Sequence, residues 1–173
     1  MSNNSQSFEK ETFIEFVRRG HFYEAYNMIK YEDEDDIELI FDSLFDMSYH
    51  GGNITGHAFC YYVFSLTEDS LWLSKCITLL AMANSAVEGA YALALHYARE
   101  MYDYASKMYD RSYIREALSW MLLLYSLPEG LLSDDEAFDI AQKMLAVDSG
   151  NKKAKKIIED IQKKKKNKDR DSG

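Results

Sequence analysis

Residues 133–154 read SDDEAFDIAQKMLAVDSGNKKA, and they contain the signals for one complete helix and the start of another. Ser133 followed by Glu136 is a capping box, in which the two residues satisfy each other's free backbone N–H groups at a helix N-terminus. Apolar side chains then recur at helical spacing as far as Val147. Gly150 and Asn151 separate this helix from a last one, which we expect to end near residue 165. The stretch therefore predicts two consecutive helices joined by a short turn.

The same alternation of helix and short joint extends through the chain. Gly20 ends the first helix, Asp33 is a plausible N-cap, and HGGN at residues 50–53 stops the helix that Asp33 begins. Thr67 is the expected cap of a fifth helix, and Ser85 with Glu88 is expected to form another capping box. The expected helices cover about residues 13–17, 22–29, 34–49, 54–66, 68–83, 86–108, 111–126, 134–147 and 152–165.

The amino-acid composition favours an all-α protein. Leu, Ala and Met together number 40, whereas Val and Thr number only 8, and there is one proline. Straight-chain side chains lose little rotamer freedom in a helix. A chain of 173 residues is the length of a single domain. We expect an acidic helical body over residues 1–150, then a C-terminal helix to about residue 165 and a basic disordered tail, within 151–173.

Other features of the sequence indicate a soluble and cytoplasmic protein. Cys60 and Cys76 form no CxxC pair, and each lies in an apolar stretch, which is typical of a small buried side chain in a reducing compartment. The first residues, MSNNSQSFEKE, are polar and acidic, unlike a secretory signal. The longest apolar run, residues 71–83, contains Ser74, Lys75 and Thr78 and is too short to cross a bilayer.

Two stretches resemble parts of the tetratricopeptide repeat. In EAFDIAQKMLAVDSGNKKA, residues 136–154, the pairs Glu136–Ala137 and Met144–Leu145 stand where the second helix of that repeat has its own pairs. Asp148, Asn151 and Ala154 match its exit turn, although Ser149 replaces the usual proline. GHFYEA, residues 20–25, resembles the turn between the two helices of a repeat, and SYIREA at 112–117 echoes that turn without its glycine.

The spacing between these stretches is irregular, so the resemblance does not extend to a regular 34-residue array. It implies consecutive antiparallel helical hairpins, in an α-solenoid of the tetratricopeptide-repeat type. It also implies a protein-interaction scaffold, because stacked hairpins form a concave face that binds protein segments.

No motif in the sequence indicates an enzyme. The four histidines show no HExxH or other tight ligand spacing, and His50 and His57 alone do not supply the three or four ligands that a zinc site needs. There is no GxSxG, no P-loop and no GxGxxG. We therefore expect neither a catalytic residue, nor a bound metal, nor a cofactor.

Charge is the most distinctive property of the sequence. The net charge is −9, and no Lys or Arg occurs between Lys30 and Lys75. From residue 151 onward the charge is +6, which leaves −15 on the first 150 residues. Such a body repels phosphate backbones, so we do not expect it to bind nucleic acid. The Lys-rich end could contact nucleic acid or an anionic surface, but such ends are more often solvated termini.

The helix that begins after Asp33 concentrates this charge on one side. Ile37, Ile40, Phe41 and Leu44 share an inner face, and Asp35, Glu38, Asp42 and Asp46 lie opposite them. Like charges four residues apart cost about 0.2–0.5 kcal/mol a pair, and no basic residue nearby in the sequence offsets them. With Tyr49 at its end, this row of carboxylates is the candidate site for a basic protein partner. The alternative is a solvated face that serves solubility. Neutralisation of these carboxylates within the fold by Lys75, Arg99 or Arg115 would remove the docking surface.

In size, charge and lack of catalytic motifs the chain is similar to bacterial immunity proteins of contact-dependent growth inhibition and related polymorphic-toxin systems. Proteins of this kind bind nuclease toxins and cover their basic active sites. The resemblance implies a toxin inhibitor whose acidic face binds in place of phosphates. Two other functions remain open: a tetratricopeptide-type secretion chaperone, which holds an effector segment in a concave groove, and an adaptor on the same scaffold. No feature of the sequence identifies an oligomeric state.

Overall fold

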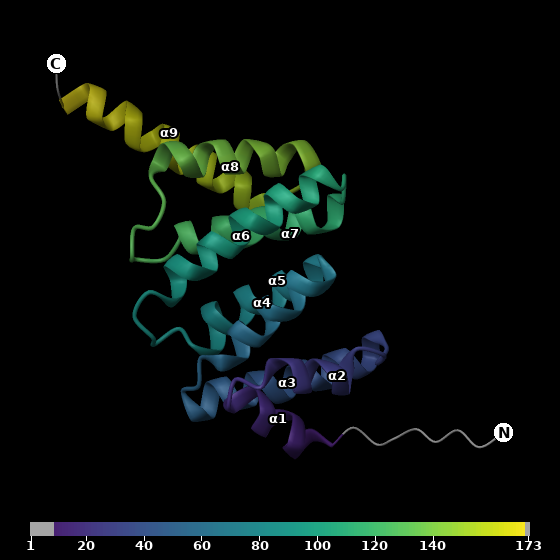
Figure 1. Ribbon diagram of the computed structural model, residues 1–173. Coiled ribbons are helices and arrows are strands. Elements are labelled where there is room, and N and C mark those ends of the chain that lie inside the picture. The colour runs from purple at the N-terminus through teal and green to yellow at the C-terminus, as the bar shows by residue number, and fades with distance from the viewer. Residues whose placement is uncertain (1–8, 172–173) are drawn as a thin grey trace. The chain divides into compact units, whose positions relative to one another are not determined.

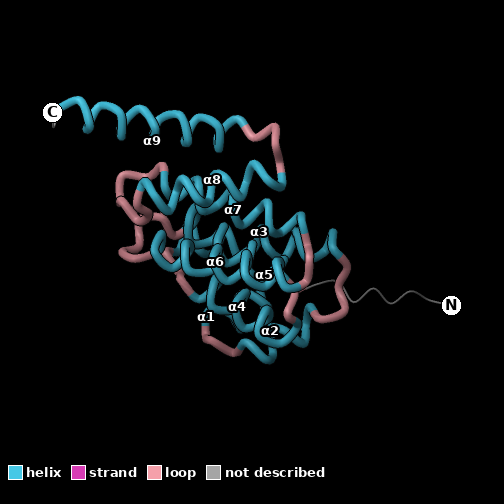
Figure 2. Tube along the Cα trace, turned by 90° about the horizontal axis from the view of Figure 1, so that it is seen from above, coloured by secondary structure: helices cyan, strands magenta, loops and turns pink. Residues whose placement is uncertain are grey.

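The computed structural model describes residues 9–171, except for the side chains of residue 34 and residues 168–171, and in this part of the chain the structure is helix and loop without strands (Figures 1 and 2). The prediction of an all-α protein is confirmed. The helices belong to two compact units, residues 1–90 (unit 1) and residues 91–173 (unit 2). This division lies elsewhere than the boundary expected near residue 150.

Unit 1 contains five α-helices and one π-helix among its described residues. They are α1 (Lys10–Arg18), α2 (Phe22–Ile29), α3 (Glu34–Gly51), α4 (Thr55–Thr67), α5 (Ser70–Thr78) and the π-helix η1 (Leu79–Ala83), which continues α5. Phe59 of α4 lies at the centre of the core, with its ring 5.4 Å from that of Phe13 and 6.1 Å from that of Trp72, edge to face in both pairs. Aromatic burial of this kind holds α1, α4 and α5 together.

Unit 2 contains α6 (Ala90–Lys107, whose first residue closes unit 1), α7 (Arg111–Tyr125), α8 (Asp134–Val147) and α9 (Lys152–Asp171). Alanines without solvent exposure, including Ala98, Ala117 and Ala141, let the helix backbones approach closely. α8 packs against both α7 and α9. Lys164 and Lys165 of α9 pair with Asp134 and Asp135 at the start of α8, at 3.1 and 2.7 Å. α9 continues beyond residue 165, where the last helix was expected to end.

The ends of α8 and α3 lie at the capping residues that the sequence predicted. The capping box is confirmed: the Glu136 N–H donates to Ser133 Oγ at 3.2 Å, and the Ser133 N–H donates to Glu136 Oε2 at 3.0 Å. Asp33 caps α3 as expected, and Gly52 ends it at φ +58°.

Two predicted caps were wrong. Asp69, not Thr67, caps α5, since its carboxylate accepts the Leu71 N–H at 2.9 Å. Thr67 instead bonds back to the Val63 carbonyl within α4. Ser85 and Glu88 form no capping box, because the chain turns at Gly89, with φ +81°, before α6 begins.

Cys60 and Cys76 are buried, and the Cys76 thiol donates to the His57 carbonyl at 3.3 Å, which confirms the prediction that they are small core side chains. Within residues 9–171, no helix combines the length and the apolar character that crossing a membrane requires.

Candidate functional site

α3 presents the predicted carboxylates on the side opposite its core stripe. Its inner side is buried at Ile37, Ile40, Phe41 and Leu44, as the sequence predicted, and Met47 extends this stripe. The outer side is exposed at all five predicted site residues: Asp35, Glu38, Asp42, Asp46 and Tyr49. We call Asp35, Glu38, Asp42 and Asp46 the acidic face. The structure therefore brings the predicted residues to one accessible surface of unit 1.

Lys75 of α5 neutralises one member of this face. Its ammonium lies 2.5 Å from Glu38 Oε1 and 4.3 Å from the centre of the Phe41 ring. The Lys75 side chain is 10% exposed and that of Glu38 is 61% exposed. The pair joins α3 to α5 across 37 residues of sequence. Of Lys75, Arg99 and Arg115, the three bases that could have neutralised the acidic face, Lys75 therefore does so at Glu38.

The other three carboxylates of the acidic face are unpaired. Asp35, Asp42 and Asp46 have no ion pair among the described residues. Arg99, another of those bases, pairs with Glu136 of unit 2 at 3.1 Å. Three carboxylates therefore keep their charge toward solvent along α3.

Acidic groups crowd together just before and at the start of α3, around Glu32, Asp33 and Asp36. Partial burial raises the pKa of Glu32, and a hydrogen bond with Asp36 and repulsion from Asp36 and Asp33 raise it further. Desolvation is the largest cause of this shift, and the two neighbouring carboxylates add a smaller repulsive contribution. A cation in this region would relieve that repulsion.

Apolar side chains are exposed among the carboxylates, and the sequence analysis did not identify the most important of them. Leu39 is 63% exposed, and helical geometry places it beside Asp35, Asp42 and Asp46. Tyr49 is 61% exposed, and its ring stacks on that of Phe45 at 6.1 Å. The sequence could have indicated the exposure of Leu39, because its helical position lies outside the buried stripe of α3. Carboxylates interspersed with accessible leucine and tyrosine suit a protein partner better than solvent alone.

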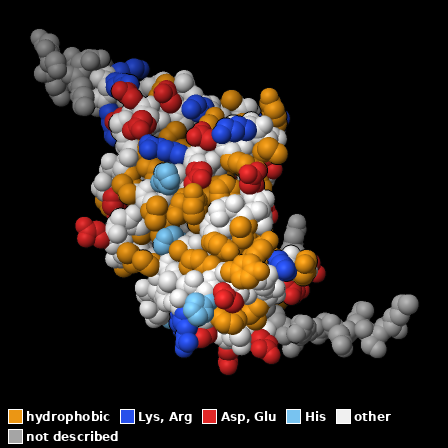
Figure 3. All heavy atoms as spheres, in the orientation of Figure 1, with side chains coloured by type: hydrophobic (Ala, Val, Ile, Leu, Met, Phe, Trp, Pro, Cys, Tyr) orange, Lys and Arg blue, Asp and Glu red, His pale blue; other side chains and the backbone are white. Residues whose placement is uncertain are grey.

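The charge of the chain divides unequally between the two units. Unit 1 carries 15 acidic residues against five Lys or Arg, a formal charge of −10, whereas unit 2 carries 14 against 15, a formal charge of +1. On the face seen in Figure 3, most of the Lys and Arg side chains, drawn in blue, lie over unit 2. The negative potential of the protein is thus concentrated on the unit that contains α3.

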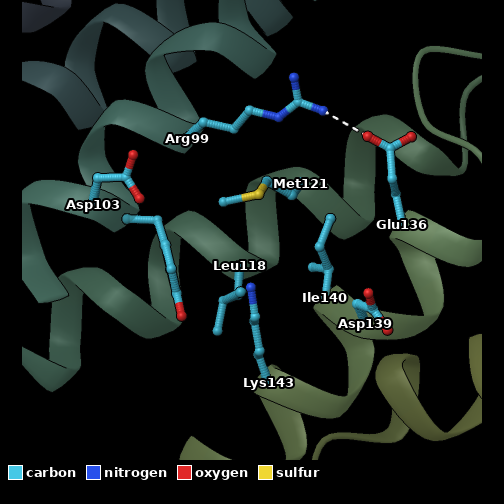
Figure 4. Close-up of a pocket in the computed structure, with 9 residues that line it drawn as sticks. Arg99, Asp103, Leu118, Met121, Glu136, Asp139, Ile140 and Lys143 are labelled. Atoms are coloured by element: carbon cyan, nitrogen blue, oxygen red, sulfur yellow. Dashed lines mark hydrogen bonds and ion pairs between the residues drawn. The ribbon is translucent and has the colours of Figure 1, made fainter.

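Unit 2 contains a groove with a cavity of about 300 Å³ between α6, α7 and α8 (Figure 4). Leu118, Met121 and Ile140 form its apolar floor. Charged residues of both signs surround this floor: Arg99 and Asp103 on α6, and Glu136, Asp139 and Lys143 on α8. The Arg99–Glu136 ion pair spans one end, and at the other Lys143 lies 5.3 Å from the centre of the Tyr102 ring. We call this feature the unit 2 groove.

The histidines and cysteines form no reactive cluster. Burial lowers the pKa of His57 and therefore favours its neutral form. Among the described residues, no three His, Cys, Asp or Glu side chains are placed to hold a metal ion.

Comparisons of the chain with protein-family models, with curated proteins and with solved structures find no match.

Proposed function

We propose that this chain is an immunity protein, which binds a basic toxin domain through the acidic face of α3 and covers the active site of that domain. The observation that carries the proposal is the combination on α3 of three unpaired carboxylates with exposed Leu39 and Tyr49. A nuclease toxin has an electropositive cleft for phosphates, and a row of carboxylates matches that cleft in charge. No enzymatic activity of this chain is required.

The electrostatics explain how such a complex would form quickly. A charge of −10 on unit 1 attracts a cationic domain before contact, and steering of this type raises association rates by about 10- to 1,000-fold. Leu39 and Tyr49 would then lose water on contact and slow dissociation. Charge therefore sets the association rate, and apolar contact sets the dissociation rate.

The scaffold that we propose is an irregular α-solenoid of the tetratricopeptide type, built from consecutive antiparallel hairpins. The confirmed capping box of α8 and the short connection from α8 to α9 support it, because both lie in the stretch that resembles the repeat. We place the protein in the bacterial cytoplasm, where an immunity protein of contact-dependent inhibition meets the incoming toxin.

The experiment is a protection assay with the double variant Asp42→Lys, Asp46→Lys. The chain is produced in bacteria together with the C-terminal domain of the protein encoded immediately upstream of its gene, which we expect to be the basic toxin. The parent chain should restore growth, and the double variant should fail to protect, because its reversed charges repel a basic partner. Both side chains are exposed, so the variant should keep its helical circular dichroism spectrum.

The matched control is Glu129→Lys, Glu159→Lys, which changes the net charge equally at exposed positions of unit 2. It should protect as well as the parent. Full protection by the Asp42, Asp46 variant would contradict the proposal and leave the acidic face a solubility feature.

The unit 2 groove favours a second candidate function, that of a secretion chaperone or adaptor. Its apolar floor with charged walls suits an extended protein segment. Binding of this kind would depend weakly on salt, because the floor rather than the charge supplies the affinity. Met121→Ser and Ile140→Ser would then abolish binding of an effector segment, whereas Asp42→Lys with Asp46→Lys would not. A gene neighbourhood with a secretion apparatus would also favour this candidate.

A further inference from the structure

A second cavity, of about 330 Å³, lies in unit 2 between the end of α7 and one side of α9. Lys153, Lys156 and Lys164 line it from α9, and Tyr125 lines it from α7. Spacings of three and eight residues place these lysines along one side of the helix. This cavity is separate from the acidic face, and it concentrates positive charge in a chain whose net charge is −9.

The lysines of this cavity differ in their partners. Lys164 donates to both carboxylate oxygens of Asp134, at 3.1 and 3.3 Å, and the Tyr125 hydroxyl donates to the same carboxylate at 2.8 Å. Lys153 and Lys156, by contrast, have no ion pair among the described residues. Two ammonium groups at the cavity are therefore left without a carboxylate.

The Lys153 and Lys156 side chains are both exposed, so the two ammonium groups are accessible to a ligand from solvent. Desolvation at the cavity wall nevertheless lowers the pKa of Lys153, because its surroundings disfavour the charged form. Asp160 also lines the cavity, so the lining side chains carry three positive charges and one negative charge. An anion placed between Lys153 and Lys156 would balance the excess.

We propose that this cavity binds a small organic phosphate. Its phosphate would lie between the Lys153 and Lys156 ammonium groups, and its apolar or aromatic part against Ile157 and the Tyr125 ring. Lysine binds phosphate through its compact charge, and two such charges match a phosphate dianion. The cavity has the volume of a small-molecule site, which leaves room for more than the phosphate group. This inference does not depend on the proposed immunity function.

The test is a titration of the full chain, followed by amide and lysine side-chain NMR, with three probes: AMP, inorganic phosphate and adenosine. AMP should give saturable shifts at the cavity and raise the pKa of Lys153, inorganic phosphate should bind more weakly, and adenosine should not bind. The variant Lys153→Gln, Lys156→Gln should weaken AMP binding by about tenfold or more, because two charge-assisted contacts are lost.

The matched control, Lys163→Gln with Lys166→Gln, removes two exposed lysines of the same helix outside the cavity and should bind AMP as the parent does. Thermal unfolding of both variants should match the parent, which separates loss of binding from loss of folding. Three results would overturn the proposal: no saturation with AMP or phosphate, equal binding of adenosine and AMP, or equal weakening in the control variant. The last would show nonspecific attraction to a Lys-rich helix.

Discussion

Lys75 illustrates how one side chain can determine the character of a charged surface. Its ammonium is largely buried, with Glu38 on one side and the Phe41 ring on the other, so it both anchors α3 to α5 and removes one charge from the acidic face. The two partners differ in exposure, at 10% for Lys75 and 61% for Glu38. Removing one partner or the other should therefore have different consequences.

We predict that Glu38→Gln destabilises the protein by about 1–2 kcal/mol, because it leaves a buried ammonium without its carboxylate. Lys75→Met should change the free energy of unfolding by less than about 1 kcal/mol, because methionine fills the same space and the exposed Glu38 is hydrated. Urea unfolding of both variants measures the difference. Equal destabilisation by the two substitutions would show that the pair contributes symmetrically. Lys75→Met also frees a fourth carboxylate, so it should strengthen binding of a basic partner.

Leu39 provides a test of the apolar part of the proposed interface. Leu39→Ala should leave the free energy of unfolding within about 0.5 kcal/mol of the parent, because the side chain is exposed in the free protein. It should raise the dissociation rate of the toxin complex by about fivefold to thirtyfold, because a side chain buried on binding contributes about 1–2 kcal/mol. Surface plasmon resonance measures that rate.

The control for Leu39 is Leu66→Ala, a second leucine of unit 1 that is 51% exposed and lies on α4. An unchanged dissociation rate for Leu39→Ala, or the same increase for Leu66→Ala, would show that Leu39 lies outside the interface.

Among the helices, α8 offers the clearest dependence of stability on pH. Hydrogen bonds from the Ser133 backbone and hydroxyl lower the pKa of Glu136 below its ordinary value of 4.5, with a smaller contribution from Arg99. A carboxylate with a lowered pKa in the folded state stabilises the protein above its unfolded-state pKa. This stabilisation disappears as the pH falls through the folded-state pKa.

We therefore predict that Glu136→Gln is less stable than the parent at pH 7, and that the difference narrows as the pH falls below about 4.5. Urea unfolding at a series of pH values measures it. Glu129→Gln, in the exposed loop before α8, is the control, and its free energy of unfolding should equal that of the parent at every pH. A gap for Glu136→Gln that does not change with pH would show that the capping box acts through hydrogen-bond geometry alone.

α3 combines features that favour helix with features that oppose it. Asp33 caps it and its inner stripe is buried, but Glu38, Asp42 and Asp46 repeat every four residues and repel one another. Lys75 relieves the repulsion at Glu38 only. A helix that retains destabilising charges on its exposed side is consistent with selection for binding at the expense of stability.

How far the sequence predicted the structure depended on the range of the interactions involved. The caps at Asp33 and Ser133 and the inner stripe of α3 were predicted correctly, because they depend on residues three or four positions apart. The cap at Thr67 was wrong because Asp69, two residues later, competes for the same helix start. The π-helix of Leu79–Ala83 had no signal that we recognised.

The candidate site was predicted in part for the same reason. Helical spacing placed Asp35, Asp42 and Asp46 together, but the pairing of Lys75 with Glu38 joins residues 37 positions apart. No local pattern contains that contact, and the two cavities of unit 2 likewise require several helices to be assembled. The helical spacing that places the carboxylates on the outer side of α3 also places Leu39 there. Its role was missed because the candidate site was chosen by charge, and leucine has none.

Across the chain, the segregation of charge gives the two units different roles in the account proposed here. Unit 1, at −10, supplies the attraction for a basic partner, whereas unit 2, near neutrality, contains the unit 2 groove and the cavity beside α9. Attraction between unit 1 and a cationic domain acts over about 8–10 Å at physiological salt, so added salt should weaken it.

The most direct test is the rate of association between the full chain and the C-terminal domain of the protein encoded upstream of its gene, which we expect to be the toxin. Stopped-flow fluorescence measures this rate at increasing NaCl concentrations. The account predicts a rate that falls steeply with salt for the parent chain. Asp42→Lys with Asp46→Lys should associate about tenfold or more slowly at low salt, and the two rates should converge at high salt. A parent rate that does not change with salt, or a double variant that associates as fast as the parent, would contradict docking through the acidic face of α3.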